Sequence, residues 1–521
     1  MRSEPVLVLG ATGYVGGRLV PRLLEAGYRV RVMGRSEAKL ESRPWASHPL
    51  METVQGDVLH PASLEKAARG CWAAFFLVQS VGGRGNGSRD AQRRAAWNMV
   101  AASLHSSLER IIYLGPLGGD CNTPAGRDGR SRCEVAATLQ SGRVPVTVFL
   151  APTILGSGSA SFEVMRYLAD RQPVVLAPLW MQAPIQPISI RNVLFYLMKC
   201  LEQERTIGET FEIGGPDILS FQDLIQIYAE LAGLRKRIIL QAPFVTPRLG
   251  ALWIHLITPV PAAIVEPLSE GLVRGGVCHD TRIHSILPQD LLGVRETIRR
   301  ALEHVEKQTV EACWTDAGAL RPPEWTWYGD EQFAGGAIMR CGYSIRLRAS
   351  PEEVWEHIVR IGGQTGWYYG GSLWRMRGWL DKVFGGTSLS RGRRHPSILY
   401  VGDALDFWRV LEVAAPQRLL LLSEMKMPGE AILEFEITDL GNGQTDLKQL
   451  SRFRPRGIAG LLYWYSLYPP HQWLFRGMLK TIADAVGKPV LGGPARFTPK
   501  LENRCAATDT AKLRDEHFHL S

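Results

Sequence analysis

The stretch "VLVLGATGYVGG" (residues 6–17) decides the fold, because it joins a short apolar strand to a glycine-rich turn and then to a helix. Gly10 permits the tight turn, Gly13 lets the backbone approach a pyrophosphate, and Gly16 allows the helix to pack closely on the strand. The N-terminus of the helix then directs free N–H groups at the anion. The pattern predicts a dinucleotide-binding loop, and the alternative is a turn with a purely structural role.

Short apolar runs alternate with helical patterns over residues 6–155. The runs include "VLVLG", "RVRVMG", "WAAFFLV" and "RIIYLG", each followed by a helical segment. This alternation predicts an α/β fold, a Rossmann-type doubly wound parallel sheet with crossover helices. Residues 162–308 continue as mixed helices and short strands, and we expect "PIQPISIRNV" and "TFEIGG" to belong to an appended substrate lobe. Residues 1–315 are thus predicted to form one NAD(P)-binding domain with its lobe.

A Pro-, Trp- and Gly-rich stretch, residues 316–337, is predicted to be a linker. Beyond it, residues 338–487 read as an α+β domain. Segments such as "AILEFEI" alternate in the antiparallel manner, and a helical pattern runs over residues 457–486 with an expected break at Pro469–Pro470. We therefore expect a twisted sheet wrapped round one long helix. The polar residues 488–521 are predicted to be a disordered tail.

The end of the second predicted strand bears on the choice of cofactor. A dinucleotide with a free ribose 2′-hydroxyl favours an acidic residue there, whereas this chain has Arg35 and Lys39. Arg35 can hold a 2′-phosphate through a contact of about 1.5–3 kcal/mol, about 10- to 100-fold in affinity, so NADP is preferred over NAD. The alternative is a solvated surface arginine. Asp57, after the third strand, can accept the adenine amine or cap the next helix.

Composition narrows the range of partners and locations. The net charge of +9 is spread along the chain, and the basic cluster "SRGRRH" (residues 390–395) reads as a solvated loop, so no nucleic-acid partner is expected. The eight cysteines lack metal-binding spacing and read as reduced thiols in a cytoplasmic protein without a metal. The first predicted strand begins at Pro5, so no signal peptide is expected. Two apolar stretches, residues 249–265 and 458–475, read as core or pocket wall, with contact at a membrane surface as the alternative.

Four segments of the N-terminal half resemble atypical short-chain dehydrogenase/reductases of the NmrA-like type, namely "GATGYVGG", "GDV", "FFLVQS" and "RIIYLGPLGG". The resemblance spans about residues 5–310, and "SGSASFEVMRYL" with "QPISIRNV" is similar to a bacterial branch that carries a C-terminal domain of unknown function. Three C-terminal segments are similar to that domain, "GWYYGGSLWRMRGWLDKVFGG", "VGDALDFWRV" and "RGIAGLLYWYSLYP". It resembles the START-like, polyketide-cyclase helix-grip fold, which implies a small apolar ligand between sheet and helix.

The resemblance exposes a departure in the segment "DGRSRCEV" (residues 128–135). Related reductases have a tyrosine and, four residues later, a lysine, where this chain has Asp128 and Arg132 with Ser131 between them. Arg132 can keep the structural duty of the lysine by hydrogen-bonding the nicotinamide ribose. Asp128 is a poor substitute for a phenol, because its reference pKa of about 3.9 leaves it ionised at neutral pH. The predicted cofactor contacts are Gly10, Thr12, Gly13, Tyr14, Val15, Gly16, Arg35, Asp57, Val58, Leu77, Val78 and Arg132.

Two classes of function follow. The first is an NADP-dependent oxidoreductase that uses another proton donor, such as Tyr113 just past the fifth strand, or none. The second is a non-catalytic NADP(H) sensor or regulator with an apolar-ligand module. We favour the enzyme, because a substrate lobe and a second ligand domain exceed what a sensor needs. In the C-terminal domain, the predicted cavity walls are Trp355, Trp374, Phe407, Trp408 and residues 461–468, with an ordinary aromatic core as the alternative.

Overall fold

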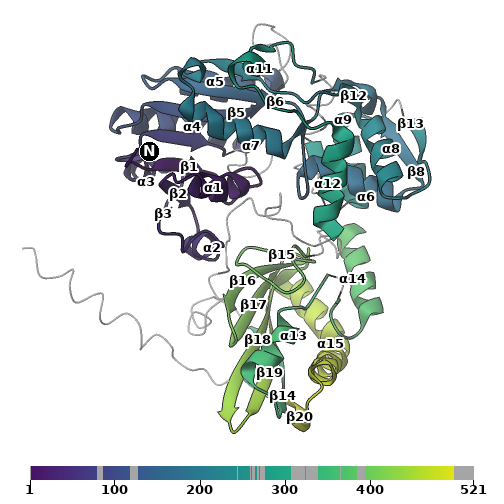
Figure 1. The fold of residues 1–521 in the computed structure, drawn as a ribbon. Helices are drawn as coiled ribbons and strands as arrows, with labels where there is room; N and C mark the ends of the chain where they lie inside the picture. Colours follow the sequence, from purple (N-terminus) through teal and green to yellow (C-terminus); the bar gives the residue numbers. More distant parts are fainter. Residues whose placement is uncertain are drawn as a thin grey trace, which may run out of the picture. The chain divides into compact units, whose positions relative to one another are not determined.

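The computed structural model describes residues 2–78, 86–117, 127–242, 245–258, 276–306, 338–363, 365–383 and 393–497, with positions 260, 265, 266, 269 and 323. The side chains at the start of two helices (residues 86–89 and 127–133) are among those not described, as are residues 247–248, 255–257, 305–306 and 379–383. The chain divides into two compact units, Met1–Ala319 and Leu320–Ser521 (Figure 1).

The first unit is built on a seven-stranded parallel sheet, which confirms the predicted Rossmann-type fold. The strand order is β11-β6-β5-β4-β1-β2-β3. The chain reverses its direction of winding between β1 and β4, which in such sheets opens a crevice at the carboxyl ends of the strands. The strands are β1 (Val6–Leu9), β2 (Val30–Gly34), β3 (Met51–Gln55), β4 (Ala73–Phe76), β5 (Arg110–Pro116), β6 (Val146–Ala151) and β11 (Thr210–Glu212).

Helices cover both faces of this sheet (Figure 1). One face packs against α1 (Gly16–Glu25), α7 (Ile190–Lys199) and α11 (Arg282–Ile286), and the other against α3 (Pro61–Ala68), α4 (Asn86–Leu104) and α5 (Arg127–Gln140). The strands are apolar on both sides, as buried parallel strands must be: in β1, Val8 belongs to the first core and Leu7 to the second. A short helix, α2 (Glu37–Glu41), follows β2.

A smaller lobe stands beside the sheet within the same unit (Figure 1). Its core includes Phe162, Leu224 and Ile298, all fully buried or nearly so. The lobe contains α6 (Ala160–Arg171), β8 (Val174–Pro178), α8 (Phe221–Leu231), β13 (Ile238–Ala242), α9 (Pro247–Ile257) and α12 (Val294–Glu306). Short bridging strands join it to the sheet domain: β7 (Ile154–Leu155), β9 (Pro184–Ile185), β10 (Ile188–Ser189) and β12 (Leu219–Ser220).

Two segments assigned to this lobe from sequence belong to the main sheet domain instead. "TFEIGG" contains β11, which pairs with β6 as the seventh parallel strand. The helix after "PIQPIS" is α7, whose residues Val193 and Leu197 are buried in the core against α1. The chain enters the lobe, returns to complete the sheet, and then re-enters the lobe, an order that local sequence patterns do not reveal.

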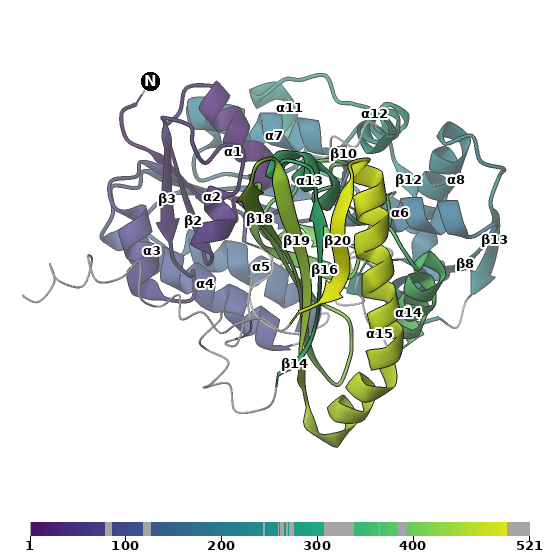
Figure 2. The ribbon, with the colours of Figure 1, turned by 90° about the horizontal axis from the view of Figure 1, so that it is seen from below.

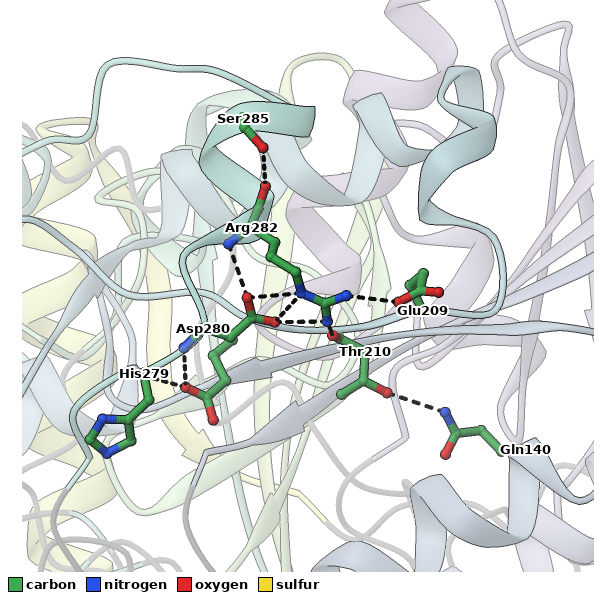
Figure 3. Close-up of polar contacts among 8 residues, drawn as sticks. Gln140, Glu209, Thr210, His279, Asp280, Arg282 and Ser285 are labelled. Atoms are coloured by element: carbon green, nitrogen blue, oxygen red, sulfur yellow. Dashed lines mark hydrogen bonds and ion pairs between the residues drawn. The ribbon is translucent and has the colours of Figure 1, made fainter.

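The exposed edge of β11 is secured by a polar cluster around α11 (Figure 3). Glu212 accepts hydrogen bonds from the backbone N–H groups of His279 and Asp280 through one oxygen, at 2.5 and 3.1 Å. The Arg282 guanidinium pairs with Asp280 at 3.0 Å and with Glu209 at 3.1 Å. The segment before and within α11 is thereby held against the last strand, which shields a sheet edge that would otherwise be open to pairing.

The second unit has a seven-stranded sheet of antiparallel neighbours and a long helix, as predicted (Figure 2). The helix α15 (Gly457–Val486) packs against β14 and β19. The strand order is β15 (Ala404–Leu405), β16 (Trp408–Ala414), β17 (Arg418–Ser423), β18 (Gly429–Gly441), β19 (Gln444–Pro455), β14 (Met339–Leu347) and β20 (Val490–Arg496). Two further helices are α13 (Pro351–Ile358) and α14 (Gly371–Val383).

Two expectations about this unit are wrong. The helix α15 is not broken at Pro469–Pro470 but includes both prolines. A proline inside a helix costs about 3 kcal/mol, and the buried inner face of α15, with Phe475 and Ile482, offsets that cost by packing on the sheet. The predicted disordered tail also begins too early, because β20 pairs with β14. A short exposed edge strand containing Gly-Gly-Pro carries little apolar pattern, so β20 is not recognisable from its residues alone.

Candidate functional site

The loop between β1 and α1 has the geometry that its glycines predict. Gly10 adopts φ of +90°, and a Cβ there would lie 2.8 Å from the carbonyl oxygen of Leu77, which follows β4. At Gly16 a Cβ would lie 2.2 Å from the carbonyl oxygen of Gly10. The two positions therefore accept only glycine, one for backbone conformation and approach to the neighbouring strand, the other for packing of helix on loop.

The surroundings of Gly13 fit a pyrophosphate. A Cβ at Gly13 would meet only the Gly10 carbonyl oxygen, at 3.2 Å, so the other side of this residue is open. No side chain caps α1 at its N-cap residue Val15, and the first turn of α1 contains no acidic residue. Partly exposed Thr12 and Tyr14 complete the loop. An uncapped helix N-terminus beside an open glycine is suited to hold an anion.

Arg35 lies where the sequence places it, directly after β2 and exposed. Its backbone carbonyl accepts a hydrogen bond from Gln55 at 3.5 Å, while Ser36 caps α2 by accepting from the Lys39 N–H at 3.3 Å. The Lys39 side chain is buried, so of the two basic residues Arg35 is the one available to solvent. The structure thus leaves Arg35 accessible to a ligand at the end of β2.

Asp57 takes part in the turn that leads into α3. Its Oδ1 accepts the N–H of Leu59 at 3.0 Å, and its backbone carbonyl accepts the Ser63 hydroxyl at 2.9 Å. These contacts match the capping alternative, although the cap position of α3 itself is His60. Val58 is buried beside α4. Leu77 and Val78, both partly buried, follow β4 at the same carboxyl edge as the glycine loop.

An arginine that the sequence did not single out joins the loop to the lobe. The buried Arg18 of α1 donates to the carbonyl and hydroxyl oxygens of Ser157, at 2.8 and 3.2 Å, and stacks on the Tyr14 ring at 4.7 Å. The neighbouring Gly156 is crowded, because a Cβ there would lie 2.6 Å from the Tyr14 hydroxyl. The partners are 139 positions apart, so no local pattern could have revealed them. This contact holds Ser157, just before the first helix of the lobe, against the helix that follows the predicted phosphate loop.

The sequence predicted that Tyr113 lies just past the fifth strand. In the structure it lies inside β5. It is only 5% exposed, and its ring packs against Phe76 with centroids 6.2 Å apart. The ring extends along the strand over Gly115, where a Cβ would lie 3.1 Å from the phenol oxygen. Its hydroxyl therefore sits within the packed layer, which weakens the case for Tyr113 as the proton donor.

Asp128, Ser131 and Arg132 lie on the first two turns of α5. Their side chains fall outside the described residues, so the proposed contact of Arg132 with a ribose stays a prediction. Among the described residues, no group of three His, Cys, Asp or Glu side chains is arranged to hold a metal ion. Within the same part of the chain, no helix is both long and apolar enough to cross a membrane.

In the second unit, the predicted cavity walls form an aromatic core. Phe407 packs against Trp374 and Trp408 at ring distances of 5.6 and 5.7 Å. Trp367, which the sequence analysis missed, completes the cluster, stacking on Phe407 at 5.7 Å and donating its indole N–H to Asp406 at 2.9 Å. Burial raises the pKa of the Asp406 carboxyl. These rings fill space against one another, which supports the core alternative for them.

Residues 461–468, predicted to line a cavity, have some side chains buried and others exposed to solvent. Trp464 is buried and stacks on Phe453 at 5.6 Å, whereas Leu462 and Tyr465 are 68% and 63% exposed. Trp355 is partly buried at the margin of the core. The segment as a whole is therefore not the lining of an internal cavity.

Comparison with known protein families divides the chain in the same way. Residues 10–136 match a family described as NAD(P)H-binding, and residues 334–478 match a family described as a protein of unknown function, DUF2867. The first unit therefore has a Rossmann-type fold, within which residues 10–136 are similar to the NAD(P)H-binding family. The C-terminal family description carries no activity.

Curated relatives match part of this chain. An isoflavone reductase homolog of Lupinus albus is 24% identical over 262 residues, which are 48% of this chain and 83% of the relative. A (4-alkanoyl-5-oxo-2,5-dihydrofuran-3-yl)methyl phosphate reductase of Streptomyces griseus is 26% identical, over 42% of this chain and 70% of the relative. A 3-beta-hydroxysteroid dehydrogenase of Mycolicibacterium neoaurum is 30% identical over only 31% of its own length. The structure of a nucleoside-diphosphate-sugar epimerase from Staphylococcus aureus has 15% identity and a TM-score of 0.47, covering 57% of this chain and 99% of that chain.

Proposed function

We propose that the protein is a cytoplasmic NADP(H)-dependent oxidoreductase of the atypical short-chain type that acts on an apolar substrate without a Tyr-x-x-x-Lys pair. The observation that carries the proposal is the open, uncapped loop from Gly10 to Gly16 beside an exposed arginine at the end of β2. The reductase names of two relatives that align over most of their own length support it.

Different residues of the first unit would contact different parts of the cofactor. The loop N–H groups and Gly13 would hold the pyrophosphate, and Arg35 would hold a 2′-phosphate, which favours NADP over NAD. Leu77 and Val78 would line the crevice after β4. The Arg18–Ser157 contact would keep the lobe in place across that crevice, so that a substrate is positioned against the cofactor. A bound nicotinamide would supply or accept a hydride.

The missing phenol limits the kind of substrate. Hydride addition to an ordinary ketone leaves an alkoxide that needs a nearby acid, and neither Asp128 nor packed Tyr113 is suited to that role. Enones and quinones give delocalised anions that water can protonate. We therefore propose conjugated apolar carbonyl compounds as the substrate class, with protonation by solvent.

The sensor remains the second candidate, and the substitution at residues 128 and 132 is the observation that favours it. A sensor would bind NADPH and NADP⁺ with different affinities and turn nothing over. In either case we propose a START-like helix-grip fold for the second unit, supported by the long helix α15 packed on an antiparallel sheet.

The test combines binding with turnover on the full chain. NADPH and NADH are titrated by fluorescence, and NADPH oxidation is then followed with a panel of apolar ketones, enones and quinones. Turnover of enones or quinones, with tighter binding of NADPH than NADH, is the expected result. Binding without turnover across the panel supports the sensor, and failure to bind either dinucleotide refutes both candidates.

A further inference from the structure

The outward face of α15 carries a line of large apolar side chains. Ile458, Leu462, Tyr465 and Trp473 are 76%, 68%, 63% and 54% exposed. Their spacing of four, three and eight residues puts them on one side of a helix with 3.6 residues per turn. We call these four residues the apolar stripe. Scattered exposed apolar side chains are common, but a row of four along one helix is typical of a surface that contacts a protein or a membrane.

Two cations continue the same side of the helix. Arg476 and Lys480 follow Trp473 by three and seven residues, and residues 457–475 carry no Asp, Glu, Lys or Arg. The Arg476 guanidinium stacks on the Tyr343 ring at 5.6 Å, which restrains it. The only acidic residue of α15 is Asp484, in its last turn. The face therefore changes along its length from apolar to basic.

A groove of about 420 Å³ lies where the apolar and the basic parts of this α15 face meet. Its lining includes Tyr369, Trp473, Arg476, Lys480 and Pro494. Its aromatic wall is well packed: the Trp473 ring stands edge-on to Tyr369 at 4.8 Å. The Tyr369 ring also lies so close to Gly477 that a Cβ there would be 2.2 Å away. Two cations beside two aromatic rings are suited to a phosphate headgroup next to acyl chains.

We propose that this face of α15 binds the surface of a membrane that contains anionic phospholipid. The apolar stripe enters the boundary between headgroups and acyl chains, where Trp and Tyr are favoured, and Arg476 and Lys480 contact the lipid phosphates. Charge complementarity selects this occupant: the basic groove adjoins the stripe, and the chain carries a net charge of +9. The inference is independent of the proposed enzymatic function.

Sedimentation of the full chain with vesicles tests the proposal. We expect binding to vesicles of phosphatidylcholine mixed with phosphatidylglycerol, little binding to phosphatidylcholine alone, and release at high salt. The double variant Arg476→Gln/Lys480→Gln should partition about 30-fold more weakly, because each basic residue near such a surface contributes about a factor of five. The double variant Ile458→Gln/Leu462→Gln should lose at least about tenfold through lost apolar burial.

Matched controls carry the same changes elsewhere on the second unit. Leu440→Gln alters an exposed leucine near the end of β18, and Arg348→Gln alters an exposed arginine; both should bind as wild type. Circular dichroism checks that each variant is folded. If Arg476→Gln/Lys480→Gln does not fold, the single variant Lys480→Gln replaces it. Absence of vesicle binding, or equal binding to neutral vesicles, overturns the proposal. So does a wild-type dimer that Leu462→Gln converts to a monomer, because the face would then be a protein interface.

Discussion

Gly13 and Gly16 belong to the same loop, yet an added side chain would meet different surroundings at each. At Gly16 a Cβ would collide with backbone, 2.2 Å from the Gly10 carbonyl oxygen, whereas at Gly13 it would meet the same atom at 3.2 Å, a tight contact that needs a shift of only a few tenths of an ångström. Gly16→Ala should therefore destabilise the first unit by about 1–3 kcal/mol. Gly13→Val should leave the melting temperature almost unchanged but abolish dinucleotide binding. Thermal melting and NADPH titration of both variants check the pair; normal NADPH binding by Gly13→Val would contradict the assignment of this loop.

Under the proposed function, Arg35 sets the preference between the two nicotinamide cofactors. Arg35→Asp should weaken NADPH binding by about 10- to 100-fold and leave NADH binding nearly as it was, because only NADPH carries the 2′-phosphate. Arg143→Asp is the matched control, since Arg143 is also exposed but precedes β6 at the opposite edge of the sheet. Equal affinities of the wild type for both cofactors would show that Arg35 is an ordinary surface residue.

Asp128 and Arg132 should behave differently on mutation. Asp128→Ala should lower turnover far less than the 10²–10⁴-fold typical of losing a general acid or base, because an ionised carboxylate donates no proton. Arg132→Ala should weaken NADPH binding instead. Steady-state kinetics on a substrate found in the panel, with cofactor affinity measured separately, distinguishes the two. A thousandfold loss in Asp128→Ala with intact NADPH binding would make the aspartate the acid.

At the scale of an element, α15 contains a histidine that is partly buried and neutral in the folded chain. The His471 ring stacks on Phe475 with centroids 5.4 Å apart, and its Nδ1 has no hydrogen-bond partner among the described residues. Desolvation, helped by the charge of Arg377, lowers the pKa of His471 from 6.5 to about 4. The unfolded chain therefore binds a proton at about pH 5 that the folded chain does not.

The sign of this effect gives a pH prediction. The stability contributed by neutral His471 is complete above about pH 6.5 and is lost progressively as the pH falls toward 4, by about 3 kcal/mol in total. Urea unfolding of the second unit, followed by tryptophan fluorescence at a series of pH values, should show this decline. His471→Phe should flatten it, whereas a change at exposed His105 should not. An unchanged pH profile in His471→Phe would mean that the imidazole is already solvated.

Elements were predictable from sequence where their own residues determine them. The apolar runs and the Gly10–Gly16 spacing define β1, α1 and the loop between them, because a buried parallel strand and a phosphate turn each need particular residues locally. The proline penalty in α15 is also local, but it is outweighed by packing on the sheet, which the local pattern does not contain. The Arg18–Ser157 contact was missed for the same reason.

At the scale of the whole molecule, the path of the chain limits prediction most. β11 has three residues and pairs with β6 only after the chain has passed through α6 and β8 of the lobe. Nothing in "TFEIGG" distinguishes a strand of the main sheet from one of the lobe. The domain class followed from composition and periodicity, whereas the interleaving of sheet domain and lobe depends on contacts between distant residues.

That late seventh strand matters while the protein is being made. β6, "VTVFLA", leaves the ribosome well before β11 and is almost entirely buried in the finished fold. Until β11 and the α11 segment arrive, one edge of a highly apolar strand is unpaired and can join a strand of another nascent chain. A message truncated or stalled between the codons for Ala151 and Glu212 would thus release a sheet that is nearly complete yet prone to aggregate, and slow translation of the lobe would lengthen the same exposure.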